Sequence, residues 1–399
     1  MVHHTIPSRI TSASSASSKI TVMNSRLLRL LVLALIVGSI AACSTRRPSA
    51  PAPGPSTGAA PAVPAPPAPP SGVAKSRWVP AAWSELPGFE DDALHEAWNA
   101  WLRSCERPPP AFAPLCGDVR RLSIASDAEQ RAWMVERLQP YRIEAQDGSG
   151  EGLLTGYFEP YLEASRQPGA GFNVPLYRPP ADLGVRKPWY TRQQIDTLPE
   201  VQAQLAGRAI AWVRDPVQAL VLHIQGSGRL RVREADGSTR MVRLAYAGTN
   251  DHPYKSVGRW LLDQGLVRDA TWPGISAWTQ ANPHRVQEML WANPRYVFFR
   301  EEPLDALDAG FGPRGAQGVP LTPGRSIAVD RASIPYGTPV WLASSGPTVQ
   351  LSRLVLAQDT GSAIVGAVRA DYFTGWGEQA GEIAGRLKQG LRLWALWPK

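Results

Sequence analysis

The sequence predicts a mainly β protein with α-helices, organised in more than one domain. From about residue 152 onward, short runs rich in β-branched and aromatic residues alternate with Gly and Pro, which is the pattern of strands and turns. Helical periodicity is confined to two intervals, near residues 91–138 and 256–294. The 399 residues suffice for two or three domains.

The N-terminus has the features of an export signal. Arg26 and Arg29 precede an apolar run of 13 residues, 30–42, which ends at Cys43. A membrane-spanning helix needs about 20 apolar residues, whereas a basic segment, a short apolar run and small residues before a cut are typical of a secretory signal. The sequence IAAC also resembles a bacterial lipobox, which predicts lipidation of Cys43; an ordinary signal with an incidental cysteine is the alternative. Translation is expected to start at Met23.

Residues 44–77 are predicted to form a tether. As far as about residue 72 the segment consists mainly of Pro, Ala, Ser and Gly, so it cannot bury a core. It contains GPSTG, which matches the nucleophile-elbow pattern. A Pro-rich linker is not the strand–turn–helix that this motif requires, so the match is discarded.

Charge and residue spacing argue against two classes of protein. Of the 42 Lys and Arg residues, seven lie in the first 75 residues, which contain no acidic residue. Residues 76–399 therefore contain 35 basic and all 34 acidic residues. The globular part therefore gives no net-charge reason to expect nucleic-acid binding. His95, His223, His252 and His284 occur singly, without metal-ligand spacing, so neither a metal nor another cofactor is expected.

Two helices are predicted ahead of the strands. Apolar residues recur at helical spacing within 91–105, and Ser126 with Glu129 gives a capping box at the start of the second helix. A Pro-rich loop separates Cys105 from Cys116. In an oxidising periplasm these cysteines would form a disulfide; two buried free thiols are the alternative.

The strand-like runs form two groups on either side of a predicted helical hairpin. The hairpin comprises SVGRWLLDQG and PHRVQEMLWANP. The first group of predicted strands is LLTGYFEPYLEA, ALVLHIQGSGRLRV and RMVRLAYAG, and the second is RYVFFRE, RSIAVD, TPVWLA, RLVLAQD and LRLWALWP.

Three aspartates, Asp330, Asp359 and Asp371, each follow an apolar run. Asp359 opens Asp-Thr-Gly, the form in which an aspartic protease presents its carboxylate, but such a protease needs two loops whose carboxylates share a proton. The loop after Asp359 is rich in small residues, and three aromatic residues lie within five positions of Asp371. Rings stack on sugars and carboxylates transfer protons, so a sugar-cleaving site is favoured; turn capping is the alternative.

The C-terminal part, from GVPLTPGRSIAVD to LRLWAL, resembles the three-aspartate domain of the membrane-bound lytic murein transglycosylase A family. Further motifs similar to that family follow one another in order: LTGYFEPYLEASR, LHIQGSGRLRV, YAGTNDHPYKSVGRWLL and LWANPRYVFFRE. The resemblance covers about residues 78–399. One departure is Asp251, where the family usually has Gly; a changed turn or an extra carboxylate in the groove would follow.

The resemblance implies a two-domain fold. Residues 78–158 and 294–399 are expected to form a catalytic double-psi β-barrel domain that includes the N-terminal helices. Residues 159–293 are expected to form an inserted, β-rich substrate-binding domain. A groove would separate the two domains, and the signal with its lipobox (residues 1–43) and the tether would precede them.

The resemblance also implies a reaction: cleavage of the β-1,4 bond between N-acetylmuramic acid and N-acetylglucosamine in peptidoglycan, without water, to give a 1,6-anhydro end. Because the muramyl O6 is the nucleophile, one carboxylate can act as acid and then as base, whereas a hydrolase needs a second. Asp371 aligns with the catalytic residue of the family and Asp359 with a supporting neighbour. Candidate substrate contacts, for which ordinary packing is the alternative, are Thr155, Tyr157, Gln225, Gly226, Ser227, Gly228, Tyr246, Tyr254 and Asp330.

The expected partners are peptidoglycan glycan strands and, through lipid at Cys43, a membrane. Ser44 is not the Asp that commonly signals inner-membrane retention, so the periplasmic face of the outer membrane is favoured. A monomer is expected, and a cell-wall synthesis complex is a further candidate partner. The competing hypotheses are a peptidoglycan-binding barrel lipoprotein without catalysis and an aspartic protease.

Overall fold

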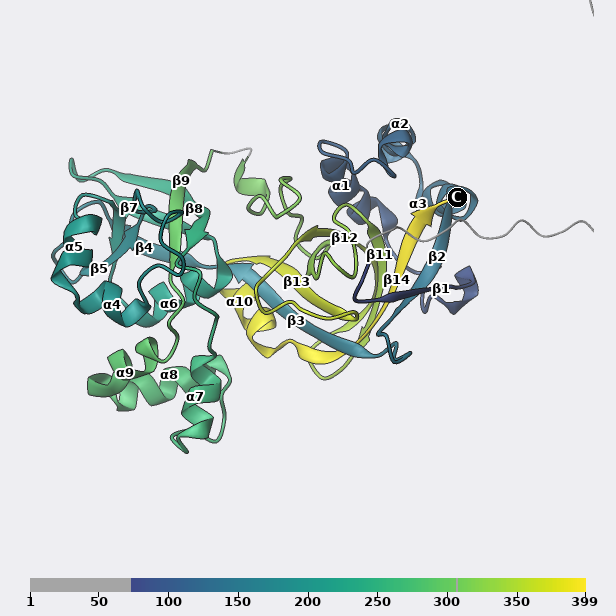
Figure 1. Cartoon of the computed structure of the whole chain (residues 1–399). Helices are drawn as coiled ribbons and strands as arrows, with labels where there is room; N and C mark the ends of the chain where they lie inside the picture. The colour runs from purple at the N-terminus through teal and green to yellow at the C-terminus, as the bar shows by residue number, and fades with distance from the viewer. Residues whose placement is uncertain (1–72, 306–307) are drawn as a thin grey trace, which may run out of the picture. The chain divides into compact units, whose positions relative to one another are not determined.

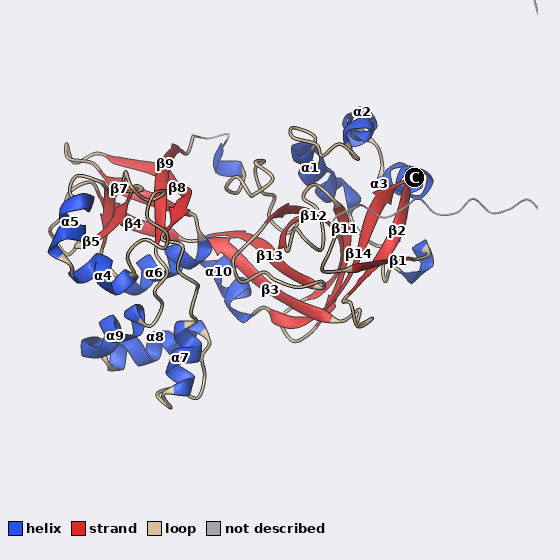
Figure 2. Cartoon of the chain, viewed as in Figure 1, coloured by secondary structure: helices blue, strands red, loops and turns tan. Residues whose placement is uncertain are grey.

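The structure, a computed structural model, describes residues 73–305 and 308–399. Two β-sheets, each with its own helices, make up this part of the chain (Figures 1 and 2). The predicted signal with its lipobox, the start at Met23, Cys43 and all but the end of the tether lie outside the described residues. Among the residues that are described, no helix is long and apolar enough to cross a membrane.

The first sheet closes into a six-stranded barrel. Its strands are β3 (Gly152–Glu159), β10 (Ser326–Val329), β11 (Pro339–Ser345), β12 (Gln350–Asp359), β13 (Arg369–Trp376) and β14 (Lys388–Pro398). They follow the order β14, β11, β12, β10, β13, β3, and β3 pairs back onto β14. The β10–β12 and β13–β3 pairs are parallel and the other four are antiparallel. A closed ring of this kind agrees with the double-psi barrel that the resemblance implies.

The barrel interior is packed by aliphatic side chains that alternate along the strands. They include Ile327 and Val329 of β10, Val340 and Leu342 of β11, and Leu391 and Leu393 of β14. At its start β3 approaches β13 very closely. A Cβ atom on Gly152 would lie 1.7 Å from the carbonyl oxygen of Val368, so a larger residue would push β3 out of the ring.

The N-terminal helices cover one side of the barrel. They are α1 (Leu94–Ser104), α2 (Cys116–Arg121), α3 (Asp127–Arg137) and the short η1 (Trp83–Glu85), η2 (Ala113–Leu115) and η3 (Leu122–Ile124), between β1 (Arg77–Pro80) and β2 (Leu138–Glu144). Ser126 and Glu129 form the predicted capping box of α3. Trp98 and Trp101 of α1 lie with their ring centroids 5.8 and 5.5 Å from that of Trp133, and this cluster packs against β11, β12 and β14.

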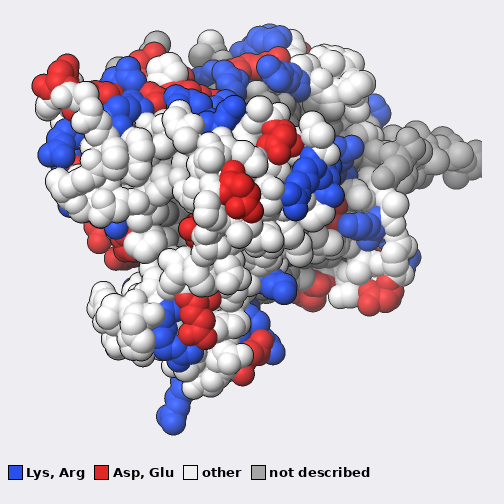
Figure 3. Space-filling model, turned by 60° about the vertical axis from the view of Figure 1, so that its left-hand side comes forward, with Lys and Arg blue, Asp and Glu red and all other residues white. Residues whose placement is uncertain are grey.

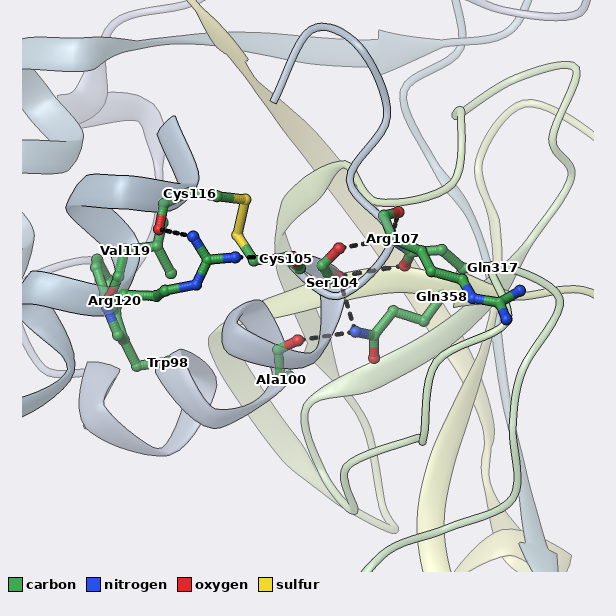
Figure 4. The surroundings of a disulfide bond; sticks show 10 residues. All are labelled: Trp98, Ala100, Ser104, Cys105, Arg107, Cys116, Val119, Arg120, Gln317 and Gln358. Carbon is green, nitrogen blue, oxygen red and sulfur yellow. Dashed lines mark hydrogen bonds between the residues drawn. A yellow bond between two sulfur atoms is a disulfide. The ribbon is translucent and has the colours of Figure 1, made fainter. Parts of the chain in front are cut away.

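A disulfide joins the end of α1 to the start of α2. Cys105 is bonded to Cys116, with their Cα atoms 5.5 Å apart. Beside it, the side chain of Gln358 on β12 donates hydrogen bonds to two oxygen atoms of α1, both at 2.8 Å (Figure 4). The disulfide therefore stabilises the helix end that contacts the residue before Asp359.

The second sheet has the strand order β5, β6, β4, β7, β8, β9. Its strands are β4 (Tyr161–Ser165), β5 (Val174–Tyr177), β6 (Ala209–Val213), β7 (Gly228–Arg233), β8 (Thr239–Thr249) and β9 (Val297–Pro303). Its helices are α4 (Arg192–Thr197), α5 (Pro199–Leu205), α6 (Pro216–Gln225), α7 (Val257–Asp263), α8 (Trp272–Ala281), η4 (Pro283–Arg285) and α9 (Val286–Trp291). The predicted helical hairpin thus contains an additional helix, α8. Short η5 (Asp308–Gly310) precedes β10, and α10 (Gly377–Arg386) lies between β13 and β14.

One prediction about this region is wrong. The apolar part of ALVLHIQGSGRLRV is not a strand, because Asp215 caps α6, Pro216 starts it, and Gly226 ends it with φ +81°. The domain boundary expected between residues 293 and 294 stays a prediction. β9 pairs with β8 along its length and belongs to the second sheet, so the chain leaves that sheet only after Pro303.

A buried ion cluster joins the two sheets. Glu159, the last residue of β3, accepts hydrogen bonds from Arg229 of β7 at 3.0 Å and from Arg243 of β8 at 2.9 Å. These three residues are at most 5% exposed. Both guanidinium groups also donate to the carbonyl oxygen of Phe311, on the chain that returns to the barrel. Arg229 lies 3.8 Å from the ring centroid of Trp376 on β13.

We expect Glu159→Ala to lower the free energy of unfolding by roughly 3–5 kcal/mol, because it leaves two buried guanidinium groups without a counter-charge. A matched control is Glu163→Ala on β4. Glu163 pairs with Arg231, and the two side chains are 59% and 60% exposed, so the loss should stay below about 1 kcal/mol. Urea denaturation followed by circular dichroism compares the two variants. Equal losses would contradict the importance assigned to the buried cluster.

Candidate active site

A pocket of about 120 Å³ lies between the two sheets and has Asp371 in its wall. On the barrel side it is lined by Asp371 and by residues 361–364, the loop that follows β12. The facing wall includes His223 of α6, Tyr254, and Arg295 just before β9. The pocket occupies the position of the groove that the resemblance implies between two β-rich parts.

Asp371 has one carboxylate oxygen held by the barrel and one free. It pairs in register with Thr155 of β3, whose hydroxyl donates to Asp371 Oδ1. Nη2 of Arg369 donates to the same hydroxyl at 2.8 Å. Because a guanidinium can only donate, the Thr155 proton is directed to Asp371. Oδ2 of Asp371 has no hydrogen-bond partner among the described residues.

The surroundings of Asp371 favour its protonated form. Burial raises the pKa of the Asp371 carboxyl above its usual range, and the Thr155 hydrogen bond and the charge of Arg369 offset this only in part. Burial likewise lowers the pKa of Arg369, although the charge of Asp371 opposes that change. A raised pKa increases the fraction of the carboxyl that carries a proton, which is the form that a general acid requires.

Asp359, at the end of β12, has both carboxylate oxygens occupied. The Tyr157 hydroxyl donates to Oδ2 at 2.9 Å, and the backbone N–H of Ala316 donates to Oδ1 at 3.0 Å. Burial raises the pKa of Asp359 to about 6, and the charge of Asp371 contributes to the rise. Asp359 is not part of the pocket wall. It interacts with Asp371 electrostatically and offers no free oxygen to a ligand.

Asp330 fixes the loop that carries the pocket wall. Its Oδ2 accepts from Lys75 Nζ at 2.9 Å and from the N–H of Gly366 at 3.0 Å, and its Oδ1 accepts from the N–H of Ala332 at 3.0 Å. Burial alone would raise the pKa of Asp330, but these hydrogen bonds lower it. The predicted substrate contact at Asp330 therefore falls on a carboxylate that lies outside the pocket.

The predicted glycan contacts at Gln225 to Gly228 also lie outside the pocket wall. Gln225 accepts a hydrogen bond from the backbone N–H of Phe158 at 3.0 Å, Gly226 ends α6, and Ser227 is buried. A Cβ atom on Gly228 would lie 2.5 Å from a leucine side chain of α6. A larger residue there would require this leucine side chain to shift.

The predicted tyrosine contacts are divided. Tyr254 lines the pocket, and burial raises the pKa of its hydroxyl. Tyr157 donates a hydrogen bond to Asp359, and Tyr246 is half exposed on β8, away from the pocket wall.

Asp251 has φ +59°, a left-handed conformation that explains the usual Gly and that Asp tolerates better than most residues. Its exposed carboxylate lies 3.9 Å from Lys187 and outside the pocket wall.

Buried Arg192 of α4, which the sequence analysis missed, organises the facing wall. Its Nη2 donates to Nδ1 of His223 and to the carbonyl oxygen of Arg295, both at 2.9 Å. Since Arg192 can only donate, Nδ1 of His223 accepts and the proton of the neutral ring lies on Nε2. Burial and the charge of Arg192 lower the pKa of His223 well below its usual range. The buried Nε2 has no hydrogen-bond partner among the described residues.

Arg369 could have been found from the sequence. It precedes Asp371 by two residues, and residues i and i+2 of a strand point to the same face. Arg192, His223 and Arg295 reach the site from separate elements and have no such signal. Across residues 73–305 and 308–399, no three His, Cys, Asp or Glu side chains are grouped as metal ligands.

Comparison with known proteins identifies the family. The model of the MltA specific insert domain matches residues 153–300, and that of the 3D domain matches residues 325–397. The membrane-bound lytic murein transglycosylase A of Vibrio cholerae is 32% identical over 271 residues, which cover 65% of this chain and 69% of that protein. The Escherichia coli K12 protein of the same name is 31% identical over 274 residues, with the same coverage.

The chain belongs to the membrane-bound lytic murein transglycosylase A family. Among solved structures, the lytic transglycosylase LtgG of Burkholderia pseudomallei is 44% identical with a TM-score of 0.56, covering 81% of this chain and 96% of that one. MltA from Neisseria gonorrhoeae is 29% identical with a TM-score of 0.67, covering 81% and 93%. The predicted family, the predicted fold class and the expectation of an enzyme of this family are therefore confirmed.

We expect the Asp359→Asn variant to be more stable than the wild-type protein at neutral pH. The folded-state pKa of about 6 lies above the ordinary value of 3.8, so wild-type stability falls as pH rises from about 4 to about 6. Asn has no charge to bury, so this loss of stability is absent in the variant. Above pH 7 the gain in the free energy of unfolding should be roughly 1–3 kcal/mol, reduced by partial solvent exposure. Below pH 4 the gain should vanish. Thermal melts from pH 4 to 8 test this; a gain that grows toward low pH would reverse the direction assigned to the pKa shift.

Proposed function

We propose that this protein cleaves the β-1,4 bond between N-acetylmuramic acid and N-acetylglucosamine in peptidoglycan without water, and that Asp371 is its general acid and base. The observation that supports the proposal most is the difference between the three aspartates. Both oxygens of Asp330 and of Asp359 are occupied by protein donors, whereas Asp371 lines the pocket with Oδ2 free. Only such an oxygen can exchange a proton with a bound sugar.

The proposed reaction balances with one carboxyl group. Protonated Asp371 donates its proton to the glycosidic oxygen O4 as the bond from muramyl C1 to O4 breaks. The muramyl O6 hydroxyl then forms a bond to C1, and its proton passes to the Asp371 carboxylate. The products are a 1,6-anhydromuramyl end and a free O4 hydroxyl on the released glucosamine, and the enzyme regains its proton.

The carboxylates around the pocket suit this reaction better than hydrolysis. Asp371 is the one carboxylate among the described residues that line the pocket. A hydrolase needs a second carboxylate to attack C1 or to activate water. Asp359 is directed to Tyr157 and Ala316 instead. Its proposed role is to orient the site and to favour the neutral form of Asp371 whenever Asp359 is ionised.

Two features of the barrel favour a single orientation of the Asp371 side chain. The Thr155 hydroxyl, itself held by Arg369, donates to Oδ1, and the register of β3 against β13 places Thr155 directly opposite. In this proposal the barrel supplies the proton-transferring group, and the second sheet with its helices, residues 161–303, supplies the opposite wall for the glycan. The same occupied oxygens of Asp359 weigh against an aspartic protease, whose two carboxylates share one proton.

We expect Asp371→Asn to lower the rate of anhydromuropeptide release at least 10²–10⁴-fold, because Asn cannot transfer the proton. Binding to purified sacculi should persist, since the rest of the pocket remains. Asp359→Asn should reduce the rate less. Mass spectrometry of digested sacculi measures the products for both variants and the wild-type protein.

Each competing hypothesis predicts a different result. Reducing muramyl ends from the wild-type protein would indicate hydrolysis. Full activity in Asp371→Asn together with an inactive Asp359→Asn would invert the two roles. No cleavage by the wild-type protein, with sacculus binding retained, would favour a binding protein without catalysis, and inhibition by pepstatin would favour a protease.

The proposal includes a lipid anchor at Cys43, on the periplasmic face of the outer membrane, after removal of the export signal. The lipobox-like IAAC and the following Ser44 support this location. The curated relatives carry "membrane-bound" in their names. The anchored enzyme would act as a monomer on neighbouring glycan strands, and a cell-wall synthesis complex is a further candidate partner.

We expect Cys43→Ser to release the protein into the soluble periplasmic fraction with its glycan-cleaving activity intact. Several acyl chains hold a protein firmly to a bilayer, and the substitution removes the thiol to which they would be attached. Fractionation followed by immunoblotting measures the distribution. A variant that stays in the membrane after a high-salt wash would contradict lipid anchoring at this residue.

A further inference from the structure

Arg295 lines the pocket, and most of the donors of its guanidinium group are unused. Nη1 donates to the carbonyl oxygen of His252 at 3.2 Å, and this is its single hydrogen bond among residues 73–305 and 308–399. Within the same residues it forms no ion pair, although the side chain is half-buried. A guanidinium carries five N–H donors, so several remain for a ligand.

The backbone that carries Arg295 is fixed in place. Arg192 donates to the carbonyl oxygens of Arg295 and Pro294, both at 2.9 Å. The side chain of Asn250 donates to the Pro294 carbonyl and accepts from the N–H of Tyr296, both at 2.8 Å. Because both donors are buried, the segment before β9 is held rigidly and Arg295 projects from a preformed wall.

An anionic group of a ligand in the pocket would be recognised by an individual cation of this kind. Positive and negative side chains are interspersed over the face of the molecule in Figure 3, so this face presents no surface of a single sign. A half-buried guanidinium without a counter-ion loses part of its remaining hydration when a ligand fills the pocket. That loss is offset when the ligand presents a carboxylate, which matches the planar donor pair of Arg.

We propose that Arg295 is a specificity-determining residue that binds a carboxylate of the muramyl unit whose glycosidic bond lies at Asp371. The inference rests on the proposed function and extends it from the cleaved bond to the side group recognised. The carboxylate has two sources: the lactyl group itself in a glycan stripped of peptide, or an acidic residue of the stem peptide when the peptide is attached. Glycans made of N-acetylglucosamine alone carry neither.

The test compares Arg295→Met, which keeps the aliphatic stem, with Arg295→Lys, which keeps the charge. Arg268→Met is the matched control, because Arg268 is exposed, lies outside the pocket wall and forms no ion pair within the described residues. The substrates are peptide-free glycan strands from amidase-treated sacculi and untreated sacculi. Chitohexaose, which has no carboxylate, is assayed for binding with the Asp371→Asn variant and with Asp371→Asn combined with Arg295→Met.

We expect Arg295→Met to lower kcat/KM about tenfold, mainly through KM, on whichever substrate supplies the carboxylate. Arg295→Lys should retain part of the activity, and Arg268→Met should match the wild-type protein. Chitohexaose affinity should change less than about twofold. A loss confined to peptide-free strands identifies the lactyl group, and a loss confined to untreated sacculi identifies the stem peptide.

The proposal is overturned if Arg295→Met leaves kcat/KM unchanged on both substrates, or if it weakens chitohexaose binding as much as it weakens cleavage. The second result would mean that Arg295 supports the wall or contacts the sugar ring. Failure of the proposed function is seen separately, in the wild-type protein, as the absence of 1,6-anhydro products.

Discussion

The ion cluster around Glu159 is the constraint on which the rest of the structure depends. Its carboxylate lies where β3 leaves the barrel, and Arg229 and Arg243 reach it from two strands of the second sheet. The carbonyl oxygen of Phe311 brings in the segment through which the chain returns. The two chain segments that connect the sheets are thus held together by one buried cluster. Two guanidinium groups beside one carboxylate leave an excess positive charge. The carbonyl oxygens and the Trp376 ring stabilise that charge.

The same strand connects this constraint to the pocket. β3 completes the barrel between β13 and β14, and it carries both Thr155, which holds Asp371, and Tyr157, which holds Asp359. Whatever fixes the end of β3 at Glu159 therefore also fixes the hydrogen-bond donors of both carboxyl groups. A barrel assembled from its C-terminal strands alone would lack these donors.

The two aspartates acquire different chemistry from similar positions. Burial raises the pKa of both, so burial does not distinguish them. The difference lies in their partners: Asp359 is fully hydrogen-bonded, behind a network that includes the backbone of Ala316, whereas Asp371 has one free oxygen at the pocket. On the opposite wall, Arg192 fixes the tautomer of His223 and the backbone of Arg295 at once. One buried cation thereby positions the groups that face the carboxyl.

The sequence by itself determined the mainly β character, the first helices with the capping box at Ser126, the candidate carboxylates and, through its motifs, the family. These features are local, because periodicity, caps and short motifs are written in neighbouring residues. The stretch from Ala219 to Gln225 was misassigned because its apolar residues suit a strand as well as a helix, and a cap at Asp215 with Gly226 as terminator decides between them. Only the tertiary structure decided that β9 belongs to the second sheet and that Asp330 and Gly228 lie outside the pocket wall. It alone also brought His223 and Arg295, both hydrogen-bonded by Arg192, opposite Asp371. Those contacts join residues far apart in the chain, and their energies depend on burial and on partners that no local pattern specifies.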